Sequence, residues 1–123
     1  MKINEKLLQP KVLYNNSTGS DSTITLNDSS ANYEYLEIYF RTNDSNVYQS
    51  SIRVFSPNGK YVPLIFYLVA GNGTSIYAKM KNVFINGNTI SNYGSRYCEM
   101  SITSSVSVKN NNFIYITRVV GYK

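Results

Sequence analysis

Hydrophobic residues recur at every second position along much of the chain, and no segment shows the 3.6-residue repeat of an amphipathic helix. Between Tyr35 and Arg41, the apolar residues Leu36, Ile38 and Phe40 alternate with residues that suit a solvent-facing surface. This alternation predicts a β-strand with one buried face and one exposed face. Similar stretches, separated by turn residues, recur through the 123 residues. The chain is therefore predicted to be all-β.

Eight or nine short strands are expected. Their segments include 11–14, 23–26, 35–41, 51–55, 60–69, 76–84, 97–108 and 113–120. This spacing predicts a single-domain antiparallel β-sandwich over residues 11–123, with a jelly-roll-like arrangement or a small barrel as variants. Residues 1–10 are expected to be an arm or attachment segment. The polar stretch 15–22 is expected to be a loop between the first two strands.

Three features of the sequence indicate where particular segments lie in this fold. Pro63 lacks a backbone N–H, which indicates an edge strand or a bulge. Segment 113–120 is apolar on both faces and is expected to be a central strand. Segment 27–32 is expected to connect two strands, with one helical turn capped by Asp28 or Ser29.

A hairpin turn is predicted where Asn86, Gly87 and Asn88 lie between short apolar flanks. These three residues are expected to form an exposed loop tip.

The composition excludes several kinds of active site. The chain has no His and a single Cys, so it cannot form a Ser-His-Asp triad, a His-ligated metal site or an intramolecular disulfide. Cys98 is expected to be a small buried residue. Glu34 and Glu37 are clustered but have opposite strand parity, so they are not expected to form a glycosidase pair. No catalytic residue, metal ligand or cofactor is predicted, and the chain is expected not to be an enzyme.

The acidic loop residues Asp21, Asp28 and Asp44 suit calcium ligation by composition, but their spacing does not match a twelve-residue EF-hand loop. An adventitious or structural cation remains the alternative interpretation.

The net charge is +5, from twelve Lys and Arg against seven acidic residues, and the cations are dispersed. Tyr77, Lys79 and Lys81 are expected to share one strand face and to form, with Lys60 and Tyr61, a basic-aromatic patch. Such a patch suits single-stranded nucleic acid, although solubility charge on a sheet surface explains it better. The sequence shows neither a signal peptide nor a run of about 18 apolar residues, so no membrane insertion is expected.

Tyrosine is unusually frequent, with twelve Tyr and no Trp. Tyr33, Tyr35 and Tyr39 are expected to lie on one face of one strand. Tyrosine offers a large apolar area with a polar end, which suits a contact surface. Cross-strand packing within the sheet is the alternative.

Four stretches together resemble a known family. They are 12–16 (VLYNN), 35–41 (YLEIYFR), 51–55 (SIRVF) and 113–122 (FIYITRVVGY). This arrangement resembles a small β-rich domain of tail-fibre, baseplate and other minor structural proteins of phages and prophages of Gram-positive bacteria. The resemblance covers residues 11–122 and contains no catalytic signature.

The resemblance implies a virion component that is assembled in the host cytoplasm. It would serve as a tail-fibre, baseplate or capsid-decoration module in particle assembly or host attachment. Its partners would be other virion proteins and further copies of itself, with a trimer favoured, and a host cell-surface glycan is a further candidate. In the relatives this domain ends a longer chain, whereas Met1 lies only ten residues upstream here, so residues 1–10 are expected to attach the module. A carbohydrate-binding module and a nucleic-acid-binding barrel remain alternatives.

Overall fold

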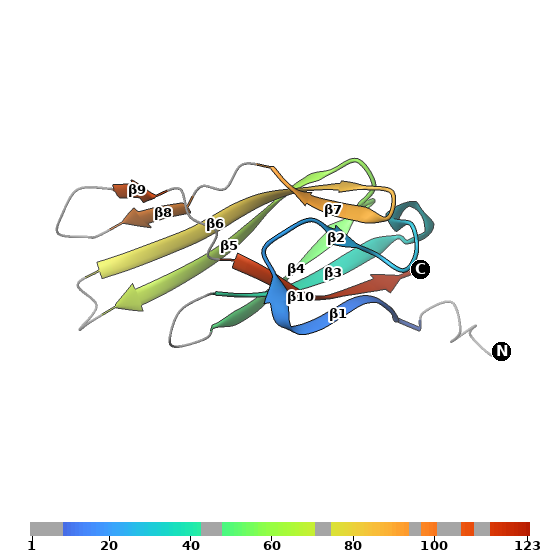
Figure 1. Ribbon diagram of the computed structural model, residues 1–123, viewed down its shortest axis with the longest axis horizontal. Helices are drawn as coiled ribbons and strands as arrows, with labels where there is room; N and C mark the ends of the chain where they lie inside the picture. The colour runs from blue at the N-terminus through green and yellow to red at the C-terminus, as the bar shows by residue number, and fades with distance from the viewer. Residues whose placement is uncertain (1–8, 43–47, 71–74, 94–96, 101–106, 110–113) are drawn as a thin grey trace.

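The computed structural model describes residues 9–42, 48–70, 75–93, 97–100, 107–109 and 114–123, without the side chains of 68–70, 75–77, 97–100 and 107–109. The described chain forms ten β-strands and one short 3-10 helix, η1 (Ser30–Asn32). The strands form two antiparallel sheets that pack as a β-sandwich (Figure 1). The predicted fold class is thereby confirmed.

The first sheet contains four strands in the order β1–β10–β3–β4. These are β1 (Lys11–Ser20), β10 (Ile114–Tyr122), β3 (Tyr35–Thr42) and β4 (Gln49–Phe55). The second sheet contains six strands, with β6 pairing with β5 along one edge and with β7 and β8 along the other. Its members are β2 (Ile24–Thr25), β5 (Tyr61–Ala70), β6 (Ser75–Asn86), β7 (Thr89–Asn92), β8 (Tyr97–Met100) and β9 (Ser107–Lys109).

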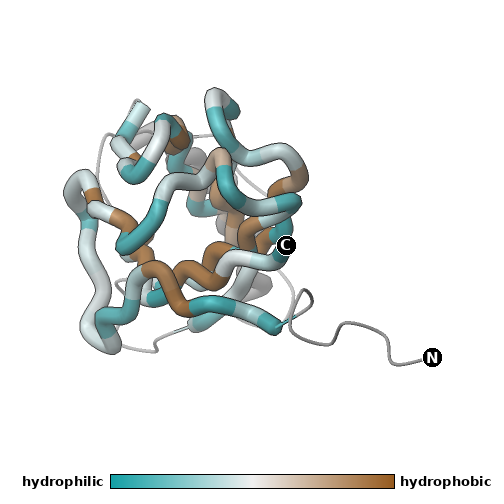
Figure 2. Tube along the Cα trace, turned by 90° about the vertical axis from the view of Figure 1, so that its right-hand side faces the viewer, coloured by the Kyte–Doolittle hydropathy of each residue, from teal (hydrophilic) through white to brown (hydrophobic). Residues whose placement is uncertain are grey.

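The core lies between the two sheets. Strand β3 shows the predicted alternation, because Leu36, Ile38 and Phe40 are buried while the residues between them are half-buried. Further buried side chains come from both sheets: Leu13, Val54, Ile114, Ile116, Val119, Val62, Leu64, Val83, Ile85 and Ile90. Figure 2 shows the hydrophobic segments gathered around the interior of the sandwich. Each fully buried aliphatic side chain contributes about 1.5–3 kcal/mol by leaving water.

Two predictions about strand position are confirmed. Strand β10 lies between β1 and β3, so the doubly apolar C-terminal segment is central in its sheet. Among the described residues, strand β5 pairs only with β6, which makes it an edge strand. Pro63 stands opposite Asn82 in an unbroken register, so the edge position, without a bulge, accommodates its missing N–H.

The loop expected at residues 15–22 is a wrong prediction, because β1 continues to Ser20. The strand keeps pairing with β10 across two register shifts. Its polar side chains form local hydrogen bonds instead of packing in the core: Asn16 Oδ1 accepts from Thr18 Oγ1 at 2.8 Å and from the Gly19 N–H at 3.3 Å. A polar sequence can therefore follow the edge of a sheet when bulges and side-chain bonds satisfy its backbone.

The expected exposed position of Lys81 on β6 is also wrong. Its side chain is 2% exposed and shares the inner face with Val83 and Ile85. The Lys81 Nζ donates to the backbone carbonyls of Asp21 at 3.1 Å and Ile114 at 3.2 Å. Burial lowers the pKa of Lys81 to about 8, against a smaller opposing effect of the Asp21 charge. These hydrogen bonds tie the second sheet to the start of β10.

The predicted helical turn is confirmed as η1, which has Ser29 as its N-cap. The Ser29 hydroxyl accepts from the Ala31 N–H, and Asp28 Oδ1 accepts from the Ser29 N–H at 2.8 Å and from Asn32 Nδ2 at 2.9 Å. Short polar side chains therefore satisfy the start of this turn, as expected for capping residues.

Candidate functional site

The outer face of the four-stranded sheet carries alternating aromatic and arginine side chains. We call this surface the Tyr-Arg face. It consists of Tyr35, Glu37, Tyr39 and Arg41 on β3, Arg53 and Phe55 on β4, and Tyr115, Arg118 and Tyr122 on β10. Three arginines against one glutamate give the face a positive charge.

A bulge in β10 assembles part of this face. Ile116 pairs with Phe40 and Arg118 pairs with Tyr39, so Thr117 is an extra residue in β10. In an unbroken strand, residues 115 and 118 would point to opposite faces. The bulge allows Tyr115 and Arg118 to lie on the same side of the sheet.

Aromatic stacking organises one end of the Tyr-Arg face. The rings of Tyr35 and Tyr122 are stacked, with centroids 4.5 Å apart and planes 10° apart. The Phe55 ring lies 5.0 Å from that of Tyr35, and the Arg53 guanidinium lies over the Tyr35 ring at 4.8 Å. Phe55 is nevertheless 52% exposed, which leaves apolar area for a partner.

Glu37 lies among the hydroxyl groups of the face. The pKa of Tyr39 is raised, first by burial and then by the charge of Glu37 and a hydrogen bond to it. The pKa of Tyr122 is raised in the same direction, again first by burial and then by the Glu37 charge. Both phenols therefore stay protonated at neutral pH, and the negative charge of Glu37 favours this protonated form.

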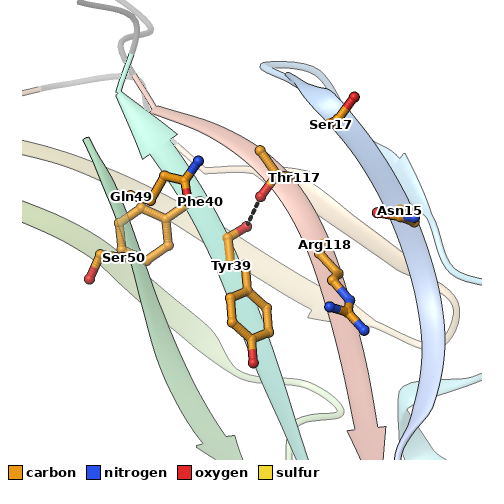
Figure 3. Close-up of a pocket in the computed structure, with 8 residues that line it drawn as sticks. All are labelled: Asn15, Ser17, Tyr39, Phe40, Gln49, Ser50, Thr117 and Arg118. Atoms are coloured by element: carbon orange, nitrogen blue, oxygen red, sulfur yellow. Dashed lines mark hydrogen bonds between the residues drawn. The ribbon is translucent and has the colours of Figure 1, made fainter. Parts of the chain in front are cut away.

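A shallow groove of about 270 Å³ lies beside Tyr39 on this face (Figure 3). It is lined by Asn15, Ser17, Tyr39, Phe40, Gln49, Ser50, Thr117 and Arg118. The Arg118 guanidinium lies 5.8 Å from the Tyr39 ring centroid. The Thr117 hydroxyl donates to the Tyr39 carbonyl at 3.3 Å and so joins two strands under the groove. The groove combines amides, hydroxyls and one cation, which suits reversible binding of a polar ligand.

The predicted tyrosine stripe is correct for two of its three members. Tyr35 and Tyr39 lie on the outer face of β3, half-buried. The prediction that Tyr33 shares their face is wrong, because Tyr33 is 5% exposed and belongs to the core. Its hydroxyl donates to Asp28 Oδ2 at 2.8 Å. Tyr33 precedes the start of β3, so the two-residue repeat does not extend to it.

The predicted loop tip joins β6 to β7. Asn86 and Asn88 are exposed, and Gly87 has a positive φ of 58° at the first of the two turn residues. A glycine suits that position because its φ falls where side chains are strained. The tip is held by its neighbours: the Gly87 N–H donates to Asn58 Oδ1 at 2.8 Å, and the Gly87 carbonyl accepts from the Ser30 N–H at 2.8 Å.

A second aromatic surface lies on the other sheet. We call it the Tyr61 patch, and it consists of Tyr61, Phe84 and Tyr93. The Tyr61 ring lies 4.6 Å from that of Phe84 and 4.8 Å from that of Tyr93. Tyr61 is 59% exposed and Tyr93 is 57% exposed. Exposed, mutually packed rings of this kind are typical of protein contact surfaces.

The expected basic-aromatic patch on β6 does not form as predicted, because Lys81 points into the core. The side chains of Tyr77 and Cys98 lie outside the described part of the structure, as do Asp44 and residues 1–8 of the expected arm. In the parts of the chain that are described, no three His, Cys, Asp or Glu side chains gather as potential metal ligands.

Alternation correctly places Arg41 on the outer side of β3 with Tyr35 and Tyr39, but it does not indicate the other two arginines of the Tyr-Arg face. The positions of Arg53 and Arg118 depend on which strands pair with β3 and on the bulge at Thr117, which local alternation does not reveal.

Comparison with known proteins adds no family to this description. No protein-family model matches the chain, and no curated protein sequence is similar to it. Over the described residues, no helix is long and apolar enough to cross a membrane. The interpretation of function therefore depends on the sequence motifs and on the geometry of the two aromatic surfaces.

Proposed function

We propose that this chain is a non-enzymatic structural module of a phage particle, and that the Tyr-Arg face is its contact surface for attachment. The observation that carries the proposal is the outward-facing set of rings and arginines on one sheet. Tyrosine and arginine are among the residues enriched where proteins make specific contacts. A location in the phage particle is supported by four motifs that resemble phage tail-fibre and baseplate domains. These motifs are residues 12–16, 35–41, 51–55 and 113–122.

In this proposal the chain acts as a homo-oligomer, with a trimer favoured. The Tyr61 patch is a separate surface on the other sheet, so it supports contacts between copies that leave the Tyr-Arg face open. Closed symmetry would bring identical patches together. Light scattering after size-exclusion chromatography should give the mass of a trimer at both low and high salt. Tyr61→Ser should shift that mass toward the monomer, and a monomeric parent chain would contradict this part of the proposal.

Mass spectrometry of gradient-purified particles tests the location. Particles released from cells that encode the chain should contain it in a fixed ratio to the other particle proteins. Antibodies against the chain should label intact particles in electron micrographs. If the chain is abundant in the lysate but absent from purified particles, the proposed role is wrong.

Carbohydrate binding is the second candidate function. The groove beside Tyr39 favours it, because sugars are recognised by amide, hydroxyl and charged groups next to an aromatic ring. The two functions are compatible if the attached surface is a glycan.

A further inference from the structure

Polar side chains of the groove beside Tyr39 are free to bind a ligand. Asn15, Ser17 and Gln49 line the groove, and within the described residues none of these side chains forms a hydrogen bond with another protein group. Amide groups supply both donors and acceptors, and hydroxyl groups do the same. Three such groups around one small concavity match a ligand that is itself rich in hydroxyls.

Arg118 adds an uncommitted positive charge to these groups. Its guanidinium lies over the Tyr39 ring, and in the described part of the chain it has no carboxylate partner. The one acid of the face, Glu37, stands opposite Arg53 in the register of β3 and β4, whereas Arg118 stands opposite Tyr39. A ligand that carries a negative charge would therefore find an arginine free to form charge-assisted hydrogen bonds.

The rings of the Tyr-Arg face argue against stacked nucleobases as the ligand. Tyr35 lies between Tyr122 and Arg53 as its packing partners, and Arg41 lies 4.9 Å from the Tyr115 ring centroid. Single-stranded nucleic acids are bound on rings whose faces are open to the bases. The face presents guanidinium groups over its rings instead.

We infer that this groove binds one sugar unit that carries a carboxylate or a phosphate group. The volume of about 270 Å³ is just below the usual range of about 300–1,000 Å³ for small-molecule sites, which suits a single ring. The sugar hydroxyls would bond to the free amides and hydroxyls, and the acidic group would pair with Arg118. This inference rests on the proposed attachment function, for which it names the chemistry of the attached surface.

Titration of the isotope-labelled full chain, followed by amide NMR spectra, tests the inference. The probes are glucuronate and glucose 6-phosphate, with glucose and inorganic phosphate as controls. One or both acidic sugars should shift the amide signals of Asn15, Gln49 and Arg118 in a saturable manner. The sugar that binds more tightly identifies the preferred acidic group. Glucose should bind at least tenfold more weakly. An equal response to inorganic phosphate would show anion binding only and overturn the inference.

Two arginine variants form a matched pair. Arg118→Gln should weaken binding of the acidic sugar about tenfold or more, because it removes a charge-assisted hydrogen bond. Arg53→Gln removes the same charge from the same face but lies outside the groove, so it should change the affinity less than threefold. Equal losses would show that only net charge matters. Gln49→Ala gives a second test in a surface side chain that makes no internal bond.

The results separate this inference from the proposed function. If the chain is found in particles but binds neither acidic sugar, the inference fails and the structural role stands. If it binds the sugar but is absent from particles, the groove is a glycan site in another setting. Tighter binding of a single-stranded oligonucleotide at the same amides would overturn the assignment to sugar.

Discussion

The ring of Tyr33 occupies the space that a side chain at Gly121 would need. A Cβ atom at residue 121 would lie 2.5 Å from Cδ1 of Tyr33 and 2.7 Å from its Cε1. Gly121 pairs with Leu36 in β3 and with Lys11 in β1, so the ring packs against the centre of the four-stranded sheet. The contact places Tyr33 in the core and away from the Tyr-Arg face.

Gly121→Ala should lower the free energy of unfolding by about 1–3 kcal/mol, the usual cost of overpacking a core. The added methyl group would be closer than 3 Å to three atoms of an aromatic ring, and a buried ring has little room to move. Urea denaturation followed by fluorescence or circular dichroism measures the change.

A Tyr33→Val background provides the control for this contact. With the ring removed, the added methyl group of Gly121→Ala should cost much less than it does in the parent chain, as expected for two residues in contact. An equal cost in both backgrounds would show that the strain arises elsewhere in β10.

Tyr33 also shows where the two-residue alternation of a strand ends. It is two residues before Tyr35, so alternation placed both on the same face. The strand begins only at Tyr35, after Glu34, whose N–H donates to the Tyr122 carbonyl at 2.8 Å. Parity arguments hold only within one uninterrupted strand. Inside β3 they were correct at every position, because one face is buried throughout.

The candidate site was predictable only in part, for the same physical reason. Alternation identifies Tyr35, Tyr39 and Arg41 as outward residues of one strand. The groove also needs Arg118 from β10, and its orientation depends on the bulge at Thr117. Alternation assigns Lys81 to the outer face together with Tyr77 and Lys79, but carbonyl groups from distant segments satisfy its ammonium inside the sandwich. Pairings between distant segments are not encoded in a local repeat.

Tyr33→Phe should raise the pKa of Asp28 toward its ordinary value of 3.8. The hydrogen bond from the Tyr33 hydroxyl is the largest cause of the lowered Asp28 pKa, followed by bonds from the Ser29 N–H and Asn32. Carboxyl carbon NMR signals followed through a pH titration measure the change. Tyr67→Phe, at an exposed tyrosine, should leave the Asp28 pKa where it is.

The same variant should change stability at alkaline pH. Burial, together with the Asp28 hydrogen bond and charge, raises the pKa of Tyr33 to about 12 from an ordinary value of 10.0. Between these values the unfolded chain loses the proton while the folded chain keeps it. The free energy of unfolding therefore falls as the pH rises from 10 to 12. Tyr33→Phe should remove this part of the decline, and an unchanged decline in urea denaturation would contradict the assignment.

Lys81 should make the protein more stable as the pH rises from 8 toward 10.5. Burial lowers its folded pKa to about 8, whereas the unfolded value is 10.5, so the unfolded chain binds more protons in this interval. The free energy of unfolding should rise by on the order of 1–3 kcal/mol. Urea denaturation at several pH values from 7 to 9.5 measures the rise, below the range in which tyrosines dominate.

Lys81→Met should abolish that rise while keeping most of the buried side-chain volume. The exposed lysine variant Lys60→Met is the matched control and should keep the rise seen in the parent chain. If Lys81→Met retains the same pH dependence, another group is responsible for it.

Asn58→Ala should release the tip of the β6–β7 hairpin. The Asn58 Oδ1 atom accepts from the Gly87 N–H at 2.8 Å and from the Ser30 hydroxyl at 3.5 Å, so one side chain holds the turn and η1 together. Losing it should lower the free energy of unfolding by about 1 kcal/mol. It should also accelerate hydrogen exchange at the Gly87 amide.

Asn86→Ala, at an exposed side chain of the same hairpin, should change stability by less than about 0.5 kcal/mol and leave that exchange rate unchanged. Equal exchange rates in the two variants would show that the Asn58 bond does not hold the tip.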